Sequence, residues 1–179
     1  MKIVILDGHT NNPGDLNWDD IASQGDFTYY ERTAPEDVLS RCEDADIVFT
    51  NKIPFDKKRI DQLPSLKYIG ILATGTNIID LEYAAAQNIC VTNIPGYSTD
   101  AVTQHILALM LHFSSKVSIH NQAVQNGDWV NCQDFSFTLG SIHELSGATL
   151  GIIGLGTIGR KLAAIASLMG MKIVAAHQS

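Results

Sequence analysis

The sequence predicts an α/β protein, in which a small doubly wound parallel sheet is followed by a further strand–helix–strand unit. Short apolar segments alternate with helical segments of about 8–12 residues, which is typical of β-α-β units. Several strand segments are apolar throughout, such as IVIL at 3–6 and IGIL at 69–72. Such strands suit a sheet that is covered on both faces. A glycine-rich turn lies between two strand-like segments near the C-terminus.

The first half of the chain contains the predicted parallel sheet. Strands are expected at 2–8, 27–32, 46–50, 66–73 and 89–93, and helices at 35–45, 55–63 and 80–87. Pro35, followed by Glu36 and Asp37, suits the first turn of a helix. This half therefore predicts one domain with roughly five parallel strands.

A second region begins after a break at 94–100, where Pro95 and Gly96 precede a capping cluster. One long helix is expected over 101–124, because its apolar residues follow the i, i+4, i+8 rhythm of a buried face. Residues 128–145 have little periodicity and hold one of the two Trp residues. This segment favours packing on a partner over a simple surface loop.

Composition and charge exclude several classes of function. The 179 residues carry a net charge of −7, and no cluster of Lys and Arg suggests a nucleic-acid or anionic membrane surface. The apolar runs are shorter than the about 20 residues of a membrane span, and the N-terminal run is too short for a secretory signal. The three cysteines and six histidines show no metal-ligand spacing. We expect a cytoplasmic protein with reduced thiols and no metal.

The motif that carries chemistry is G-x-G-x-x-G after the strand at 149–153 and before a helix at 157–170. It consists of Gly154, Leu155, Gly156, Thr157, Ile158 and Gly159. The first glycine permits the tight turn, the second lets the backbone approach a pyrophosphate, and the third lets the helix pack closely on the strand. The phosphates would lie at the positive N-terminus of the helix. A glycine-rich turn without a ligand is the alternative.

The second strand, at 171–176, is followed by a departure from this pattern. An acidic residue is expected about 20 positions after the glycines, where it would bind the adenosine ribose. His177 holds that position. A histidine cannot serve as an anionic acceptor, and it tolerates a 2′-phosphate better than a carboxylate does. The motif predicts NAD as the cofactor and leaves NADP open.

Three segments of the chain together resemble a known family. They are MKIVILDGHTNNPGDLNWD at 1–19, LPSLKYIGILATGTNIIDLEYAAAQNICVTNIPGYSTDAVTQHILALML at 63–111, and ELSGATLGIIGLGTIGRKLA at 144–163. The sequence resembles the D-isomer-specific 2-hydroxyacid dehydrogenases, and within them the glycerate dehydrogenase (hydroxypyruvate reductase) group. The resemblance implies NAD(P)-dependent reduction of hydroxypyruvate or glyoxylate and oxidation of D-glycerate. The opening at 7–19 favours this group over the phosphoglycerate and formate dehydrogenases.

The resemblance also implies a domain plan. Residues 1–98 would form a flavodoxin-like substrate domain, and residues 99–179 would begin a Rossmann NAD(P)-binding domain. The segment 128–145 corresponds to a dimerisation arm, so we expect a homodimer.

Site residues follow from the same resemblance. The substrate carboxylate would be held by backbone N–H groups of Ala73, Thr74, Gly75 and Thr76. Leu155, Gly156, Thr157 and Ile158 match the pyrophosphate loop. Val102 matches a position that lines the nicotinamide pocket, although a core residue on an amphipathic helix is the alternative.

In this family an Arg polarises the substrate and a His, assisted by a carboxylate, acts as the general acid. No residue of this sequence matches them, and the histidines at 105, 112 and 120 are not candidates. We therefore expect an N-terminal portion of a longer enzyme that does not turn over alone. A non-catalytic ligand-binding or assembly module of the same fold is the alternative hypothesis.

Overall fold

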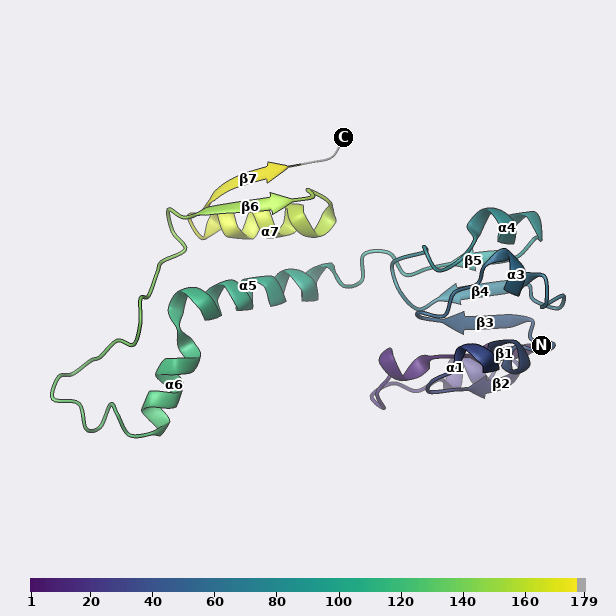
Figure 1. Cartoon of the computed structure of the whole chain (residues 1–179), viewed down its shortest axis with the longest axis horizontal. Helices are drawn as coiled ribbons and strands as arrows, with labels where there is room; N and C mark the ends of the chain where they lie inside the picture. Colours follow the sequence, from purple (N-terminus) through teal and green to yellow (C-terminus); the bar gives the residue numbers. More distant parts are fainter. Residues whose placement is uncertain (177–179) are drawn as a thin grey trace. The chain divides into compact units, whose positions relative to one another are not determined.

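A computed structural model describes residues 1–176 of the chain, which divides into two compact units, Met1–Pro95 and Gly96–Ser179. His177, the predicted cofactor-binding residue at the position where the motif expects a ribose-binding acid, lies outside the described residues. Each unit is described by itself (Figure 1).

The first unit is built on a five-stranded parallel sheet in the order β2-β1-β3-β4-β5. Its strands are β1 Lys2–Ile5, β2 Asp26–Tyr29, β3 Ile47–Thr50, β4 Tyr68–Ile71 and β5 Cys90–Thr92. The chain runs from β1 outward to β2 and then returns past β1 to β3, so the strand order reverses between β1 and β3. The predicted doubly wound parallel sheet is confirmed, and each strand lies within its predicted range or within one residue of it.

The helices of this unit are short: the three predicted ones are shorter than expected, and η1 and α1 were not predicted. They are η1 Gly8–Thr10, α1 Asp19–Ala22, η2 Pro35–Asp37, α2 Val38–Arg41, α3 Lys57–Ile60 and α4 Leu81–Ala86. Pro35 begins η2, as expected, but α2 ends early and the chain takes a left-handed conformation at Asp44, with φ of 58°. Two helices are capped by carboxylates: Asp56 accepts the Arg59 N–H at 2.9 Å, and Asp80 accepts the Tyr83 N–H at 3.0 Å.

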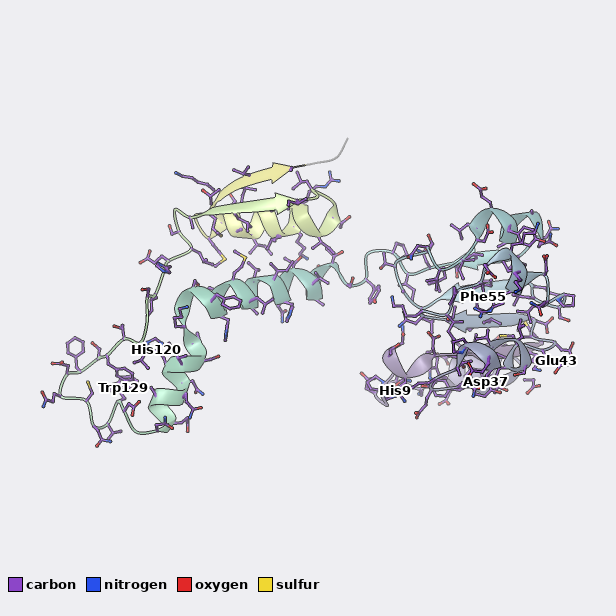
Figure 2. The ribbon with its side chains drawn as sticks, viewed as in Figure 1. His9, Asp37, Glu43, Phe55, His120 and Trp129 are labelled. Carbon is purple, nitrogen blue, oxygen red and sulfur yellow. The ribbon has the colours of Figure 1, made fainter. Side chains whose placement is uncertain are left out.

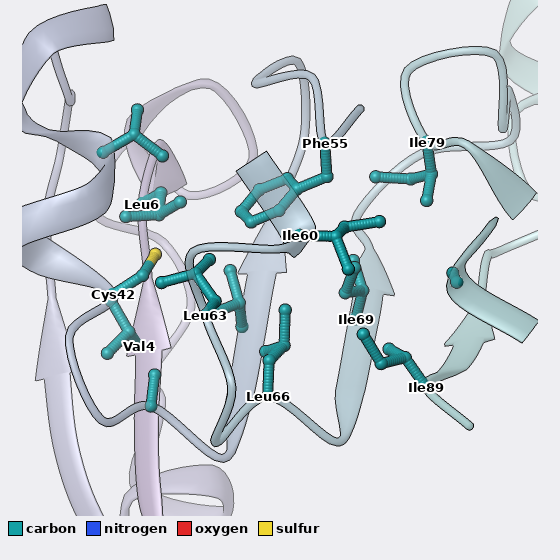
Figure 3. Close-up of a cluster of buried hydrophobic side chains, with 14 of the residues drawn as sticks. Val4, Leu6, Cys42, Phe55, Ile60, Leu63, Leu66, Ile69, Ile79 and Ile89 are labelled. Atoms are coloured by element: carbon teal, nitrogen blue, oxygen red, sulfur yellow. The ribbon is translucent and has the colours of Figure 1, made fainter. Parts of the chain in front are cut away.

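The core lies where these helices and their connections cover one face of the sheet (Figure 3). Phe55, which follows β3, is fully buried there among aliphatic side chains from the strands and from α3. Cys42 lies in the same cluster, and its burial raises the pKa of the thiol to about 12. The Cys42 thiol is therefore a packed apolar group and not a nucleophile.

The second unit contains α5 Thr99–Ser115, α6 Val117–Gln125, β6 Thr149–Ile153, α7 Thr157–Leu168 and β7 Lys172–Ala176. The single long helix predicted over 101–124 is wrong. Lys116 interrupts it in a left-handed conformation, with φ of 54° and ψ of 33°. The Ser114 carbonyl at this break accepts the His143 N–H at 3.0 Å. A tertiary contact thus satisfies a helix end that the apolar pattern could not reveal.

β6 and β7 pair in parallel, with Ile152 opposite Ala175, and α7 connects them. This strand–helix–strand arrangement follows the predicted segments closely. α7 packs on both strands and also on α5, where Lys161 and Asp100 form an ion pair. Within residues 1–176, no helix combines the length and apolar character needed to cross a bilayer.

The segment between α6 and β6 contains no regular helix or strand and is held to α6 by His120. The His120 Nε2 accepts the Leu139 N–H at 3.0 Å, and its Nδ1 lies 2.9 Å from the Lys116 carbonyl oxygen. Because Nε2 accepts, the proton of the neutral ring is on Nδ1 and is donated to Lys116. His120 and Trp129 both line a small hollow between helix and segment, and Figure 2 shows both side chains in this region.

Candidate functional site

The turn between β6 and α7 has the geometry that an anion-binding turn requires. Gly154 leaves the strand with φ of +94°, a conformation that side chains rarely adopt, and its N–H donates to Ala176 at 2.9 Å. Gly156 is extended, with φ of −78° and ψ of −162°, and caps α7. No atom lies within 4 Å of a Cβ built on Gly156, so the space beside it is open.

Gly159 has a structural task in the same turn. A Cβ built on Gly159 would lie 2.5 Å from the Gly154 carbonyl oxygen and 3.3 Å from Ile152 Cγ2. Only glycine lets α7 lie this close to the strand and turn that precede it. Of the three motif glycines, Gly156 faces open space while Gly159 is in tight packing.

The N-terminus of α7 is available to a ligand. Gly156 and Thr157 are exposed, and in the described chain no side chain caps the helix. The N–H groups of the first turn of a helix lack intrahelical acceptors and carry its positive dipole end. This turn can therefore accept a phosphate group through backbone donors.

The second candidate element is the loop after β4, at the carboxyl edge of the sheet in the first unit. Ala73 is buried and accepts the Ile94 N–H at 3.0 Å, whereas Thr74 and Gly75 are exposed. The loop is tied to the end of β5, because Thr74 Oγ1 donates to Ile94 at 3.0 Å and Asn93 donates to the Thr74 carbonyl at 2.7 Å.

These contacts involve side chains and backbone carbonyl groups, and they leave the backbone N–H groups of the loop without hydrogen-bond partners in the described part of the chain. Among the hydrogen bonds of residues 1–176, none involves the N–H groups of Thr74, Gly75 or Thr76. Three successive donors on an exposed, anchored loop can bind a carboxylate.

A polar network that the sequence analysis missed supports this edge. Asn11, in the connection after β1, donates to the Leu72 carbonyl at 2.6 Å, directly before the loop. Asp7 accepts the Thr50 hydroxyl and the backbone N–H groups of Asn51 and Lys52, at 2.7 to 3.0 Å. The signal was present, since DGHTNN places six polar or turn-forming residues directly after a buried strand.

Val102 lies in α5 near its N-terminus and is 37% exposed. This exposure agrees with a position that can face a ligand as well as with one at the margin of the core. The loop 73–76 belongs to the first unit, and Val102 and the turn 154–159 belong to the second.

Groups with shifted pKa values lie away from both turns. The Lys67 ammonium, 2.6 Å from Asp46, and the Lys2 N–H lower the pKa of that carboxyl. The hydrogen bond from Tyr83 to Asp61 raises the pKa of the phenol. Neither turn therefore contains a side chain poised for proton transfer, and what both turns offer is backbone N–H groups for anions.

The sheet order defines the chain as an α/β protein, and both turns follow the carboxyl ends of parallel strands and expose backbone N–H groups. Residues 5–167 match the family model of the D-isomer specific 2-hydroxyacid dehydrogenase catalytic domain. The chain belongs to this family, whose members are oxidoreductases that act on a CH–OH group.

Individual relatives agree with the family. The chain is 43% identical over 178 residues to the hydroxypyruvate reductase of Blautia hydrogenotrophica, covering 98% of this chain and 55% of that protein. It is 36% identical over 151 residues to the glycerate dehydrogenase of Methylorubrum extorquens, covering 84% of this chain and 48% of that protein. An acyclic imino acid reductase, solved in complex with NADPH and D-Arg, superposes with a TM-score of 0.78 at 27% identity, covering 99% of this chain and 56% of that one. The chain spans about half the length of the curated relatives it matches.

Proposed function

We propose that the chain carries the substrate-carboxylate loop and the cofactor-phosphate turn of a D-2-hydroxyacid dehydrogenase. Its substrates would be hydroxypyruvate or glyoxylate in reduction and D-glycerate in oxidation. The observation that carries the proposal is the pair of anchored backbone turns with free N–H donors, in a chain that is 43% identical to a hydroxypyruvate reductase.

For the substrate, the N–H groups of Thr74, Gly75 and Thr76 would hold the carboxylate of a 2-oxo acid. Asn11 and Asn93 are positioning residues, because their hydrogen bonds set the position of the loop without touching the substrate. Backbone N–H donors recognise the carboxylate and do not discriminate between the other groups of the substrate. This arrangement suits small acids that differ only in the group on the carbonyl carbon.

For the cofactor, the fit rests on Gly156, beside which the space is open, and on the uncapped first turn of α7. We propose that Gly154–Gly159 hold the pyrophosphate of NAD or NADP and that Val102 lies at the nicotinamide end. The cofactor supplies the hydride for reduction of the carbonyl carbon. The residues of this chain bind and orient the two reactants.

Reduction of a 2-oxo acid also needs a proton at the carbonyl oxygen, and the residues that deliver it in the family have no match in this sequence. We therefore propose that the 179-residue chain binds substrate and cofactor but has no turnover alone. We also propose a homodimer through the segment 128–145, on which Phe135 is 92% exposed and Trp129 is 54% exposed. Free cysteines agree with a cytoplasmic location.

Calorimetric titration of the chain with NADH, NADPH and oxalate, together with an assay of NADH oxidation by hydroxypyruvate, tests the proposal. We expect saturable binding of oxalate and of at least one dinucleotide, without turnover. Binding of neither ligand would refute the proposed function, and robust turnover would refute the claim that the chain is inactive alone.

A non-catalytic binding or assembly module of the same fold is the second candidate. The chain has the two proposed binding turns and the exposed segment 128–145, but no residue of its sequence matches the family's acid–base residues. Copurification and sedimentation with a full-length family member from the same source distinguish it. A stable complex whose activity changes with the amount of added chain favours the module.

A further inference from the structure

A second candidate ligand site lies in the first unit, apart from the loop 73–76. A cavity of about 460 Å³ opens at the carboxyl ends of β1 and β3, and its lining also includes residues from the segment after β2 and from α3. None of residues 73–76 lines it. The strand order reverses between β1 and β3, and in open α/β sheets this reversal is where ligands bind. The volume is in the range of small-molecule sites.

Positive charge gathers on this cavity. Arg32 follows β2, Lys52 follows β3, and Arg59 belongs to α3, and all three line the cavity. Only 12 Lys and Arg residues occur in the whole chain, whose net charge is −7. A quarter of the cationic side chains therefore meet at one cavity of an acidic protein, which favours an anionic ligand.

Two carboxylates, Asp7 and Glu31, also line the cavity and lower its net positive charge, but they leave two of the three cations without an ion-pair partner in the described chain. Both oxygens of Asp7 already accept hydrogen bonds from Thr50, Asn51 and the Lys52 backbone. Glu31 lies 3.5 Å from Arg32 and is exposed, so this pair is weak. Among the ion pairs of residues 1–176, none involves the Lys52 ammonium or the Arg59 guanidinium.

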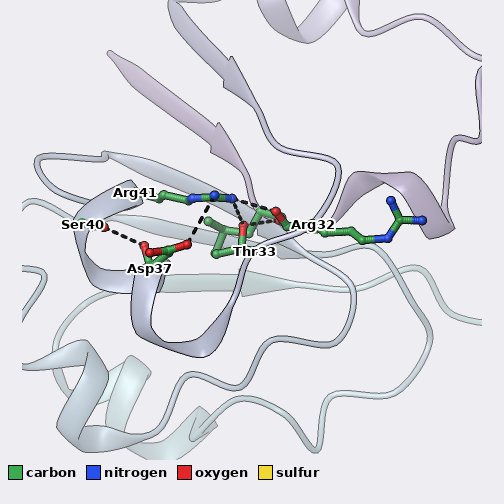
Figure 4. Close-up of polar contacts among 6 residues, drawn as sticks. Arg32, Thr33, Asp37, Ser40 and Arg41 are labelled. Carbon is green, nitrogen blue, oxygen red and sulfur yellow. Dashed lines mark hydrogen bonds and ion pairs between the residues drawn. The ribbon is translucent and has the colours of Figure 1, made fainter.

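The segment that carries Arg32 is held in place before any ligand binds. Arg41 donates to the Arg32 carbonyl at 2.7 Å and to Thr33 Oγ1 at 2.9 Å, and it pairs with Asp37 at 3.5 Å (Figure 4). The Arg32 side chain extends away from this cluster in Figure 4. A fixed backbone lowers the ordering cost of binding.

The other two cations lie on equally constrained segments. Arg59 donates to the Pro54 carbonyl, and its guanidinium lies 5.9 Å from the ring centre of the buried Phe55. Lys52 lies within a turn in which Thr50 Oγ1 accepts the Ile53 N–H at 3.1 Å. The remaining lining includes apolar side chains, namely Pro35, Val38, Ile53 and Pro54.

We propose that this cavity binds a small organic molecule through a phosphate group. Lys52 and Arg59 contact the phosphate, whose two negative charges match the two cations without carboxylate partners. Arg32 lies at the rim, and the apolar side chains contact the organic portion. This site is separate from the substrate and cofactor turns and does not depend on the proposed function.

Inorganic phosphate is the probe, titrated into the full 179-residue chain at constant ionic strength and followed by two-dimensional amide NMR. We expect saturable shifts of the backbone amides of residues 31–33, 51–53 and 59. Lys52→Gln and Arg59→Gln should each weaken phosphate binding about tenfold or more, because each removes a charged donor. Lys58→Gln is the matched control, since it removes the same charge from an exposed position on α3 outside the cavity.

Three results would overturn the proposal. Phosphate shifts confined to the turn after β6 would place the anion in the second unit. Equal phosphate affinities of Lys52→Gln and Lys58→Gln would show that Lys52 is not part of the site. Lys52→Gln is the decisive variant, because the Lys52 side chain makes no polar contact within residues 1–176 whose loss could affect folding. Binding of malonate at this edge without binding of phosphate would make the ligand a dicarboxylate.

Discussion

Alanine substitutions at two glycines of the turn after β6 separate packing from ligand access. Gly159→Ala places a methyl group 2.5 Å from the Gly154 carbonyl oxygen. That oxygen belongs to backbone that cannot shift freely, because the Gly154 N–H is bonded to Ala176 at 2.9 Å. Gly156→Ala adds a methyl group where no atom lies within 4 Å, at dihedral angles that alanine tolerates.

The two substitutions are expected to differ in the size of their effect on stability and in the measurement that detects them. At Gly159, alanine gains up to about 1 kcal/mol of helix propensity, but overpacking typically costs about 1–3 kcal/mol. We expect a net loss of about 1–2 kcal/mol in the free energy of unfolding. At Gly156, a loss of capping preference and a gain from the less flexible unfolded chain offset each other to within about 0.5 kcal/mol. On the proposed function, the new methyl at Gly156 blocks the pyrophosphate and weakens NADH binding about tenfold or more.

Urea unfolding followed by far-ultraviolet circular dichroism measures the first effect, and calorimetric titration with NADH measures the second. Gly151→Ala is the control, because Gly151 lies on β6 with no atom within 4 Å of a built Cβ. Equal destabilisation by Gly156→Ala and Gly159→Ala would refute the assignment of separate tasks. Unchanged NADH affinity in Gly156→Ala would contradict the proposed role of Gly156 in binding the pyrophosphate.

Three further outcomes follow from the structure. The pKa of Asp46 is lowered in the folded chain, so the contribution of its carboxylate to stability is complete above the ordinary carboxyl pKa and is lost as the pH falls through the lowered value. Asp46→Asn should therefore reduce the loss of stability at acid pH, as measured by urea unfolding at a series of pH values. Cys42 is buried and its thiol pKa is about 12, whereas Cys90 is exposed, so mass spectrometry after brief alkylation at pH 8 should find Cys90 modified and Cys42 intact; early modification of Cys42 would contradict the packing. His120→Ala removes the hydrogen bond from the Leu139 N–H that holds the segment 128–145 to α6, so in a Trp18→Phe background Trp129 emission should shift to longer wavelength, and an unchanged spectrum would exclude the anchoring role.

Sequence reasoning found the strands because buried parallel strands are apolar throughout. The predicted ranges around β3 and β6 nearly coincide with the observed ones. It overestimated helix length, since α2 and α3 are short turns whose flanking residues pack without helical geometry. It also missed the break at Lys116, because both helices around it are amphipathic and the contact beside the break, from the His143 N–H to the Ser114 carbonyl, comes from 29 residues further along the chain.

For the site, too, sequence reasoning found the features that depend on local sequence and missed those that depend on distant contacts. The glycine turn could be found because each glycine answers a local steric demand, which is visible as a spacing in the sequence. The polar segment DGHTNN was visible in the sequence, but the contacts that Asp7 and Asn11 make were not, because their partners are 43 to 61 residues away along the chain. The cationic cavity was missed for the same reason, since Arg32, Lys52 and Arg59 gather only when the parallel strands are in order.

The position of Asp7 has a consequence for the order of folding. Its carboxylate holds the backbone of Asn51 and Lys52, which it meets only after β1 has paired with β3, and these two strands are separated along the chain by β2 and by the helices α1 and α2. Such long-range contacts require loop closure before they contribute any stability. The carboxyl edge of the sheet should therefore acquire its final shape late, after the strands have associated. During refolding, native hydrogen-exchange protection should appear in β1 and β3 before it appears at the amides of residues 51 and 52.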